Sequence, residues 1–285
     1  MQIPSRIQIM TKYVVYKGTG GLFHNLQGLT TAIETVCSIS PPNYTLIVDM
    51  KNHGAFGCMF KDYFTICCER LTWTDNYNDV PRAIAERVAH TSAFHHGYLN
   101  PRQGNHSRSY DIDLSSDVNV IYGVTNCHVS PCIKVNEGIR QEIARGNIAP
   151  PYMAVHFRNT DIKNNPHEFI STIQTALDEH THIKTLYLAT DNSEFYQLLR
   201  DHLSVDSVTI LRNTIPAANI YNLHYGSRDK HKQMYESLQD VYHILRSTVF
   251  IPSMNSGFSR NIVHMINEQY TIFEGLVSDA RVVKA

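Results

Sequence analysis

The most constraining feature of the sequence is a regular alternation of short apolar runs with longer amphipathic segments, clearest in the second half of the chain. The apolar runs there, which predict strands, are YMAVHFR, IKTLYLATD, SVTILR and TVFIP. The segments that follow them have apolar residues at helical spacing and predict helices; they are PHEFISTIQTALDEH, SEFYQLLRDHL, KQMYESLQDVYHILR and GFSRNIVHMINEQ. Because the strands are mostly apolar and alternate with helices, we expect parallel sheets covered by helices on both faces.

The first half of the chain shows the same alternation less regularly. The predicted strands are KYVVYK, YTLIVD, FTICC and NVIYGV, and the predicted helices are residues 25–38, DVPRAIAERVAHTSAF and VNEGIRQEIARG. The segment GNIAPP, residues 146–151, is typical of a linker or hinge. We therefore predict an α/β protein with two Rossmann-like domains, residues 1–148 and 149–285, that face each other across a cleft.

Composition excludes several classes of protein. The formal net charge of -1 gives no overall attraction for nucleic acid or for an anionic membrane. No apolar run reaches the ~18 residues of a membrane span, and the N-terminus lacks the apolar core of a signal peptide, so we expect a soluble, cytoplasmic protein. None of the 6 cysteines forms a CxxC pair, so we expect reduced, mostly buried thiols rather than a zinc site or a disulfide scaffold.

Polar residues follow the predicted strands of the second half at the point where each strand ends. The four groups are His156, Arg158 and Asp161; Thr190, Asp191 and Asn192; Arg212 and Asn213; and Ser253 with residues 255–259. The carboxyl ends of parallel strands meet at one edge of a sheet, where ligands bind. An arginine there can hold two phosphate oxygens, and a helix start attracts anions. Each group alone is equally typical of a helix cap or an ion pair, but together they predict a diphosphate site.

Three motifs resemble those of a known enzyme superfamily. HFRNTD resembles the H-x-R-R-x-D motif of the fucosyltransferase superfamily, which includes nodulation α1,6-fucosyltransferases, core fucosyltransferase and protein O-fucosyltransferases. LYLATDNSEF resembles its second motif, a strand followed by ATDD, and ESLQDVYHILRSTVFIPSMNSGFSRNIVHM resembles its third. GTGGLFHNLQG is similar to its N-terminal glycine-rich loop. The resemblance extends over about residues 152–265 and is weaker before them.

The resemblance implies a GT-B fold and an inverting glycosyltransferase that moves a sugar from a nucleoside diphosphate to a glycan hydroxyl. The C-terminal domain would hold the donor and the N-terminal domain the acceptor, with no cofactor beyond the nucleotide sugar. Arg158 matches the arginine that contacts the diphosphate, and Ser256 matches the serine near it. The other residues that we expect to bind the donor are Gly20, Gly21, His24, Asn25, His156, Asp191, Asn192, Arg212, Asp240, Asn255, Gly257, Phe258 and Ser259.

Two departures from the family pattern leave the donor open. Asn159 stands where the family often has a second arginine, and Asn192 stands where it has a second acid. GDP-fucose is the favoured donor, a UDP-sugar such as UDP-xylose is the first alternative, and a non-catalytic nucleotide- or glycan-binding module is the second. The absence of an anchor favours a bacterial, viral or cytosolic protein.

Departure of a nucleoside diphosphate builds negative charge that Arg158 would stabilise, while a carboxylate or histidine takes the proton of the acceptor hydroxyl. The sequence does not decide among Asp49, Asp79 and Glu168 for this base, and Asp161 is a further expected catalytic residue. Trp73, the only tryptophan, is as typical of a core aromatic as of a platform for an acceptor sugar.

Two arrangements resemble metal sites but lack the necessary context. Asp111 and Asp113 form a DxD in a polar loop, where we interpret them as solvated charge. His95, His96, Cys127 and His128 lack the spacing of metal ligands, so we predict no required metal.

Overall fold

The structure is a computed structural model that describes residues 11–18, 20–39, 44–51, 56–89, 115–122, 128–158, 164–203, 208–213 and 229–284. The chain divides into two compact units. The first contains Met1–Gly20, His24–His53 and Cys58–Ile133, and the second contains Gly21–Phe23, Gly54–Gly57 and Lys134–Ala285. The domain boundary that we predicted from the sequence stays a prediction.

The first unit is built on a four-stranded sheet with the order β4-β2-β1-β5. Its strands are β1 (Lys12–Lys17), β2 (Tyr44–Asp49), β4 (Thr72–Thr74) and β5 (Val118–Tyr122), and all of its pairs are parallel. The helices are α1 (Leu22–Ser38), α2 (Arg82–Ala89) and the short η1 (Phe60–Asp62) and η2 (Tyr77–Asp79). A separate two-stranded sheet contains β3 (Phe64–Ile66) and β6 (Ile133–Val135).

The register of the first sheet places two charged residues side by side. Lys17 and Asp49 are the last residues of β1 and β2 and are paired across the ladder. Beneath them, Val15 and Ile47 pack with Val88 of α2 in a buried apolar cluster. The charged pair therefore lies at the carboxyl edge of this sheet, directly above its core.

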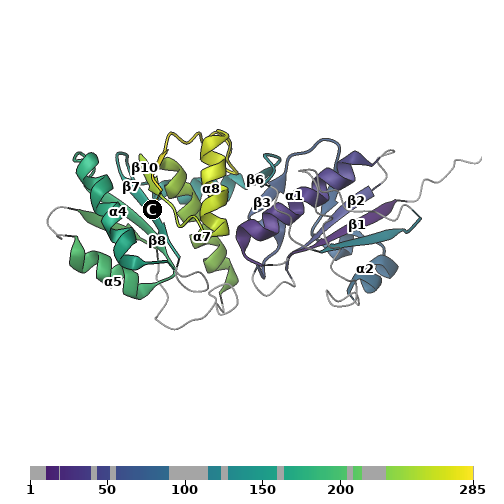
Figure 1. The fold of residues 1–285 in the computed structure, drawn as a ribbon. Helices are drawn as coiled ribbons and strands as arrows, with labels where there is room; N and C mark the ends of the chain where they lie inside the picture. Colours follow the sequence, from purple (N-terminus) through teal and green to yellow (C-terminus); the bar gives the residue numbers. More distant parts are fainter. Residues whose placement is uncertain are drawn as a thin grey trace, which may run out of the picture. The chain divides into compact units, whose positions relative to one another are not determined.

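The second unit is built on a five-stranded sheet with the order β11-β10-β7-β8-β9. Its strands are β7 (Met153–Phe157), β8 (Thr185–Thr190), β9 (Thr209–Arg212), β10 (Val249–Ile251) and β11 (Arg281–Val282), again parallel in every pair. Figure 1 shows its helices α4 (Pro166–Glu179), α5 (Ser193–His202), α7 (Lys230–Arg246) and α8 (Gly257–Asn267) around the sheet. Helix α3 (Glu137–Arg145) precedes β7.

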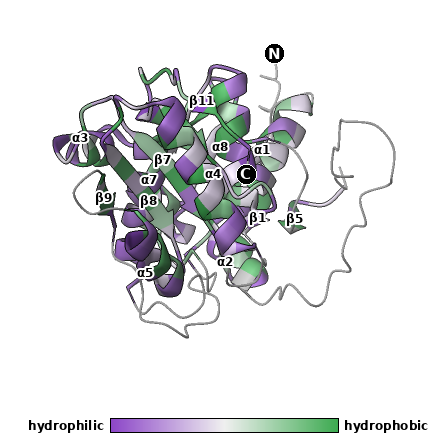
Figure 2. Ribbon diagram, turned by 60° about the vertical axis from the view of Figure 1, so that its left-hand side comes forward, coloured by the Kyte–Doolittle hydropathy of each residue, from purple (hydrophilic) through white to green (hydrophobic). Residues whose placement is uncertain are grey.

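Both faces of the second sheet are covered, as its apolar strands predict. Met153, Val155 and Phe157 alternate along β7 and pack against Phe169 of α4 and Phe195 of α5 in a buried apolar cluster. The residues between them face the opposite way, where α7 contacts β7 and β8. The predominantly hydrophobic strands are visible between amphipathic helices in Figure 2.

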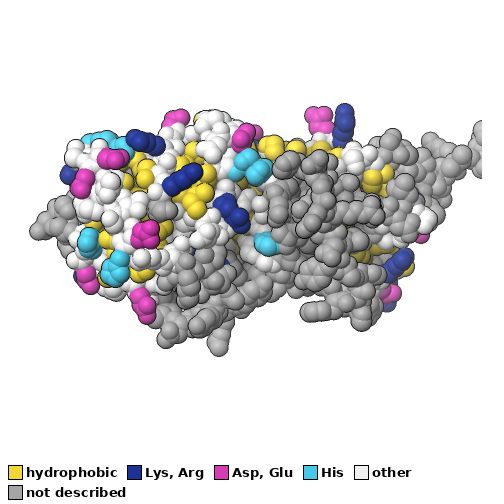
Figure 3. Space-filling model, in the orientation of Figure 1, with side chains coloured by type: hydrophobic (Ala, Val, Ile, Leu, Met, Phe, Trp, Pro, Cys, Tyr) yellow, Lys and Arg dark blue, Asp and Glu magenta, His cyan; other side chains and the backbone are white. Residues whose placement is uncertain are grey.

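The surface of the second unit carries charges of both signs. In Figure 3, its described acidic and basic side chains are interspersed rather than gathered in a patch of one sign. A site for a charged ligand must therefore be built locally. The carboxyl edge of the sheet is the place where such a site is expected in an open parallel α/β sheet.

Candidate functional site

His156 lies near the carboxyl end of β7 and is fixed by α8. Its Nδ1 is 2.6 Å from the Ser259 hydroxyl oxygen, and its ring centroid is 4.8 Å from that of Phe258. Burial, assisted by the charge of Arg158, lowers the pKa of His156 to about 3. The imidazole is therefore neutral at pH 7 and keeps one ring nitrogen as a donor and one as an acceptor.

Arg158 follows β7 directly, and its backbone is held on both sides. Its N–H donates to the Ser253 hydroxyl oxygen at 3.1 Å, and the Asn164 side-chain amide donates to the Arg158 carbonyl. The guanidinium Nε lies 4.0 Å from an Asp191 carboxylate oxygen, and these side chains are 15% and 13% exposed. This long contact to Nε is not the two-bond fork of a strong arginine–carboxylate pair, so it positions the guanidinium only loosely.

The end of β8 is tied to β7 and starts the next helix. The Thr190 hydroxyl donates to the Phe157 carbonyl at 2.7 Å and accepts from the Asn192 N–H at 3.1 Å. The Asn192 side-chain oxygen accepts from the Phe195 N–H at 2.7 Å and caps α5. Asparagine and aspartate cap helices about equally well, so this contact does not require the acid that the family carries here.

Replacing Asn192 with alanine should lower the free energy of unfolding by about 1 kcal/mol, because the cap of α5 is lost. Asn192→Asp should retain most of that stability, since a carboxylate also caps and favours the positive end of a helix. Urea unfolding of the two variants measures the difference. A stable alanine variant that binds nucleotide much more weakly would contradict the capping role and indicate a direct contact with the donor.

Buried serines shape the turn that leads from β10 into α8. The Ser256 hydroxyl oxygen accepts from the Phe258 N–H at 3.2 Å, and the Ser256 N–H donates to the Ser253 carbonyl at 2.9 Å. Ser253, Ser256 and Ser259 are each at most 1% exposed. Gly257 is exposed, and a Cβ placed on it would meet nothing within 4 Å. A side chain at position 257 would therefore meet no neighbour, so the glycine is not required by close packing.

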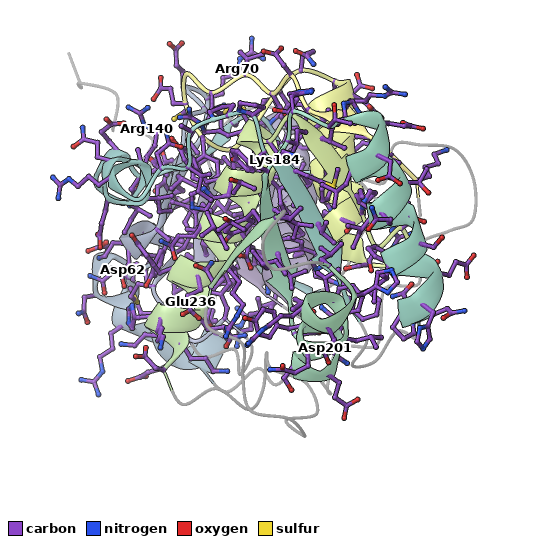
Figure 4. The ribbon with its side chains drawn as sticks, turned by 90° about the vertical axis from the view of Figure 1, so that its left-hand side faces the viewer. Asp62, Arg70, Arg140, Lys184, Asp201 and Glu236 are labelled. Atoms are coloured by element: carbon purple, nitrogen blue, oxygen red, sulfur yellow. The ribbon has the colours of Figure 1, made fainter. Side chains whose placement is uncertain are left out.

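A second polar cluster lies on α7. One carboxylate oxygen of Asp240, Oδ1, accepts from the Tyr187 hydroxyl at 2.7 Å and from the Asn213 amide at 2.9 Å. Burial raises the pKa of Asp240 to about 7 although both hydrogen bonds oppose that rise, and the nearby charge of Glu236 raises it further. Figure 4 labels Glu236, one helical turn before Asp240 on α7.

The two polar residues at the end of β9 have different surroundings. Asn213 joins the Asp240 cluster and also donates to the Glu236 carbonyl at 3.1 Å. Arg212 is exposed, and its guanidinium carbon lies 4.3 Å from the ring centroid of Tyr196 on α5. The Arg212 guanidinium also donates to the Asn213 carbonyl at 3.2 Å. These contacts are at the surface, and the predicted role of Arg212 with the donor stays a prediction.

The candidate bases of the first unit differ in exposure. Asp49 is 7% exposed, accepts from the Tyr77 hydroxyl at 2.7 Å and lies 3.9 Å from the Lys17 ammonium. Burial lowers the pKa of Lys17, against the effect of Asp49, and the ammonium also donates to the Val88 carbonyl. Asp79 is exposed and accepts from the Thr74 hydroxyl at 2.7 Å.

The glycine-rich turn before α1 is held by a buried side chain. Gly20 has a φ of 77°, which favours glycine. The Asn25 amide donates to the Gly20 carbonyl at 2.8 Å, and the Tyr16 hydroxyl donates to the Asn25 carbonyl at 2.9 Å. Asn25 is completely buried, whereas His24 is exposed and Gly21 is half-buried. The structure gives Asn25 a bracing contact within the turn.

The remaining predicted residues fall into three groups. Glu168 lies exposed in the first turn of α4, and Asn255 is exposed before α8. Trp73 is half-buried and packs edge-on against Phe60 at 5.6 Å, as the core interpretation predicts. Outside the described residues lie Asp161, Asp111, Asp113, His95, His96 and Cys127, whereas His128 is described and exposed.

Among the described residues, no group of three histidine, cysteine or acidic side chains is arranged to hold a metal ion. Within the same described part of the chain, no helix has both the length and the apolar character needed to cross a membrane.

Comparison with known proteins identifies the architecture. No family model matches the sequence, and no curated protein matches it significantly. Solved structures do match: the fucosyltransferase NodZ from Bradyrhizobium has a TM-score of 0.57 at 14% identity, over 89% of this chain and 91% of that one. The chain has a fucosyltransferase-like fold. This confirms the GT-B α/β architecture that the three motifs predicted.

Two further structures with this fold are described with GDP-fucose. NodZ α-1,6-fucosyltransferase soaked with GDP-fucose matches with a TM-score of 0.55 at 14% identity, over 88% of this chain and 91% of that one. POFUT1 in complex with GDP-fucose matches with a TM-score of 0.55 at 11% identity, over 96% of this chain and 98% of that one. The likeness at these identities is one of fold.

Sequence analysis did not single out two residues that support these clusters, Asn164 and Tyr187. Asn164 follows the motif arginine by six positions and holds its carbonyl. Tyr187 lies within the apolar strand TLYLAT, on the face opposite to Leu186 and Leu188. A tyrosine hydroxyl in the middle of a buried strand needs a hydrogen-bond partner. Tyr187 was therefore the feature of the sequence that could have indicated the Asp240 cluster.

Proposed function

We propose that the protein is a glycosyltransferase that moves a sugar, with inversion, from a nucleoside diphosphate to a hydroxyl group of a glycan or glycoconjugate. GDP-fucose is the favoured donor. The observation that carries the proposal is the joint placement of Arg158, a neutral His156 and the N-terminal end of α8 at the carboxyl edge of the second sheet. Solved complexes of NodZ and POFUT1 with GDP or GDP-fucose share the fold.

The diphosphate fits the charges of this edge. Arg158 supplies a permanent positive charge, and the N-terminal end of α8 supplies a partial one. Gly257 is exposed and carries no side chain that would keep a phosphate away. If the Ser259 hydroxyl donates to Nδ1 of His156, the proton of the ring is on Nε2, which can then donate to a phosphate oxygen. These donors would stabilise the charge that develops as the nucleotide leaves.

The Asp240 cluster supports guanine over uracil. Within the described residues, both hydrogen bonds to this carboxylate go to Oδ1, which leaves Oδ2 to accept from a ligand. Guanine presents two adjacent donors on one edge, its ring N–H and its amino group. Uracil presents a single N–H between two carbonyl oxygens, which a carboxylate repels. A carboxylate therefore pairs better with guanine.

Thermal melting in the presence of GDP or UDP tests the nucleotide preference. Binding to the native state at about 100 times Kd adds about 2.7 kcal/mol of stability, so we expect GDP to raise the melting temperature by several degrees and UDP by clearly less. ADP at the same concentration is the control, because it carries the same diphosphate charge on a different base. A larger shift with UDP would instead support the UDP-sugar alternative.

Release of the nucleotide separates an enzyme from a binding module. A coupled assay for GDP, with GDP-fucose and a mixture of glycan acceptors, should show release that depends on the acceptor. GDP binding without release would support the non-catalytic alternative.

The candidates for the general base are Asp49, Asp79 and Glu168, with Asp161 as a further catalytic residue. Asp49 already has an ion-pair partner in Lys17. Asp79 and Glu168 are exposed and so can meet an acceptor hydroxyl. Comparing turnover in the single amide variants of Asp49, Asp79, Asp161 and Glu168 would identify the base.

A further inference from the structure

Three cysteines of the first unit lie close together. Cys37 is near the end of α1, Cys68 is in the turn after β3, and Cys132 precedes β6. The sulfur atoms of Cys37 and Cys68 are 3.5 Å apart. The prediction that the thiols are mostly buried is wrong for the described residues, since only Cys58 is buried.

The surroundings of Cys37 and Cys68 allow their sulfur atoms to come closer. A disulfide bond requires about 2.05 Å between sulfur atoms, so the pair must approach by about 1.5 Å, which side-chain rotation can provide. Cys68 lies in a turn closed by the Leu71 N–H to its carbonyl at 3.1 Å, not in a sheet ladder. Both cysteines are half-buried and so remain within reach of a small reagent.

The backbone beside this pair is firmly held. The Cys67 N–H donates to the Cys132 carbonyl at 2.7 Å, and the Cys132 N–H donates to the Ser130 hydroxyl oxygen at 3.1 Å. These bonds keep the turn that carries Cys68 in place while its side chain rotates. Cys67 itself is exposed, so the adjacent cysteine is the one that faces Cys37.

We propose that Cys37 and Cys68 form an oxidation site, at which a small disulfide compound such as oxidised glutathione converts the two thiols into an intramolecular disulfide bond. The Cys68 thiolate attacks one sulfur of oxidised glutathione and releases the first glutathione thiolate. The Cys37 thiolate then attacks the Cys68 sulfur of the mixed disulfide and releases the second. The two protein thiols lose two protons and two electrons, and one oxidised glutathione becomes two reduced molecules.

The order of these steps follows from the environment of Cys37. Burial, together with the neighbouring thiols of Cys68 and Cys132, raises the pKa of the Cys37 thiol to about 11. The thiolate is the attacking species, so the raised pKa makes Cys37 a slow nucleophile, and we assign it the second step. The 3.5 Å between the two sulfur atoms places Cys37 within reach of a mixed disulfide on Cys68.

The bond would join the end of α1 to the turn between β3 and β4. Because it closes a loop that includes β2 and η1, it restricts the unfolded chain more than the folded one. Oxidation should therefore raise the melting temperature by roughly 5–10 °C, and reduction should reverse the rise.

The test uses the full chain treated with oxidised glutathione or with dithiothreitol. Free thiols are alkylated without reduction, and the peptides are mapped by mass spectrometry. We expect a linked peptide that joins Cys37 to Cys68 and has lost two hydrogen atoms, together with the rise in melting temperature. Neither readout depends on glycosyl transfer.

Serine variants provide the controls. Cys37→Ser and Cys68→Ser should abolish the linked peptide and the rise in melting temperature, whereas Cys67→Ser and Cys132→Ser should retain both. A Cys68–Cys132 bond in the wild-type chain would overturn the proposal. Stable glutathione adducts on the wild-type chain without a linked peptide would also overturn the proposal. This readout uses the wild-type chain, so it does not depend on whether the serine variants fold.

Discussion

Replacing Arg158 with alanine should lower the rate of donor turnover by about 10²–10³-fold, the usual cost of removing one charge-stabilising donor from an active site. The guanidinium lies where the leaving diphosphate would develop its charge, at the carboxyl edge of the second sheet. Its removal also takes away the positive charge that lies 4.0 Å from the Asp191 carboxylate. Steady-state kinetics with GDP-fucose and a glycan acceptor measure the loss.

The fold should tolerate this substitution. The hydrogen bonds from Asn164 and to Ser253 involve only the backbone of Arg158 and survive in the alanine variant. The side-chain ion pair that is lost is 4.0 Å long and partly exposed, and such pairs add little stability. Unfolding by urea should therefore give nearly the wild-type midpoint.

Two further variants make the kinetic result specific. Arg158→Lys should recover only part of the activity, because an ammonium lacks the planar fork that binds two phosphate oxygens. Arg281→Ala is the matched control. Arg281 is an exposed arginine at the start of β11, so it lies at the amino ends of the strands of the same sheet, away from the carboxyl edge that carries Arg158. Near-normal turnover by the Arg158→Ala variant would defeat the proposed function.

The predicted strands and helices are those marked by a continuous apolar run or by a helical period, including the three-residue strands β3 and β10 within FTICC and TVFIP. KYVVYK, YTLIVD and the second-half strands are confirmed, as are the helices between them. Helix α1 begins at Leu22, earlier than the predicted residue 25, because the glycine turn ends sooner than expected. The missed strands β4, β6 and β11 contain two or three residues each. Such strands are defined by the neighbour they pair with, which a local pattern cannot reveal.

The candidate site was predictable in position but not in its contacts. Polar residues at strand ends must share an edge in a parallel sheet, so the grouping of His156 with the α8 turn follows from topology. Which groups pair within that edge depends on side-chain rotamers and on packing between distant segments. The cap formed by Asn192, the stacking of Arg212 on Tyr196 and the pairing of Asp240 with Tyr187 are all of this kind.

Replacing Asp240 with asparagine should remove the preference for GDP over UDP. The amide oxygen can still accept from Tyr187 and Asn213, but an amide group then replaces the carboxylate oxygen that would accept from guanine. A hydrogen bond to a charged group contributes about 1.5–3 kcal/mol, so we expect GDP affinity to fall by roughly 10–100-fold, with a smaller change for UDP. Isothermal titration with both nucleotides measures the two affinities.

The pH dependence of binding provides a second test of the same carboxylate. Because burial raises the pKa of Asp240 to about 7, this group gains a proton as the pH falls from 8 to 6. GDP affinity of the wild-type chain should fall by about tenfold over that range, while the Asp240→Asn variant should show little change. A wild-type affinity that does not vary with pH would contradict the assigned contact.

Stability should respond to pH in the opposite sense to that of an ordinary paired carboxylate. The pKa of Asp240 in the folded chain lies above the ordinary value of 3.8, so between about pH 4 and pH 7 the folded state binds more protons than the unfolded state. The contribution of Asp240 to the free energy of unfolding is therefore fully present below pH 4 and is lost as the pH rises through 7. At pH 8 the Asp240→Asn variant should be more stable than wild type by at least about 1 kcal/mol.

Glu236→Gln is the matched control for both measurements. Glu236 lies one turn before Asp240, is 25% exposed, and raises the pKa of Asp240 through its charge. Removing that charge should move the midpoint of the GDP affinity profile to lower pH while the preference for GDP over UDP is retained. If Glu236→Gln and Asp240→Asn lose the preference for GDP over UDP equally, guanine is recognised by the local charge of α7 and not by the Asp240 carboxylate.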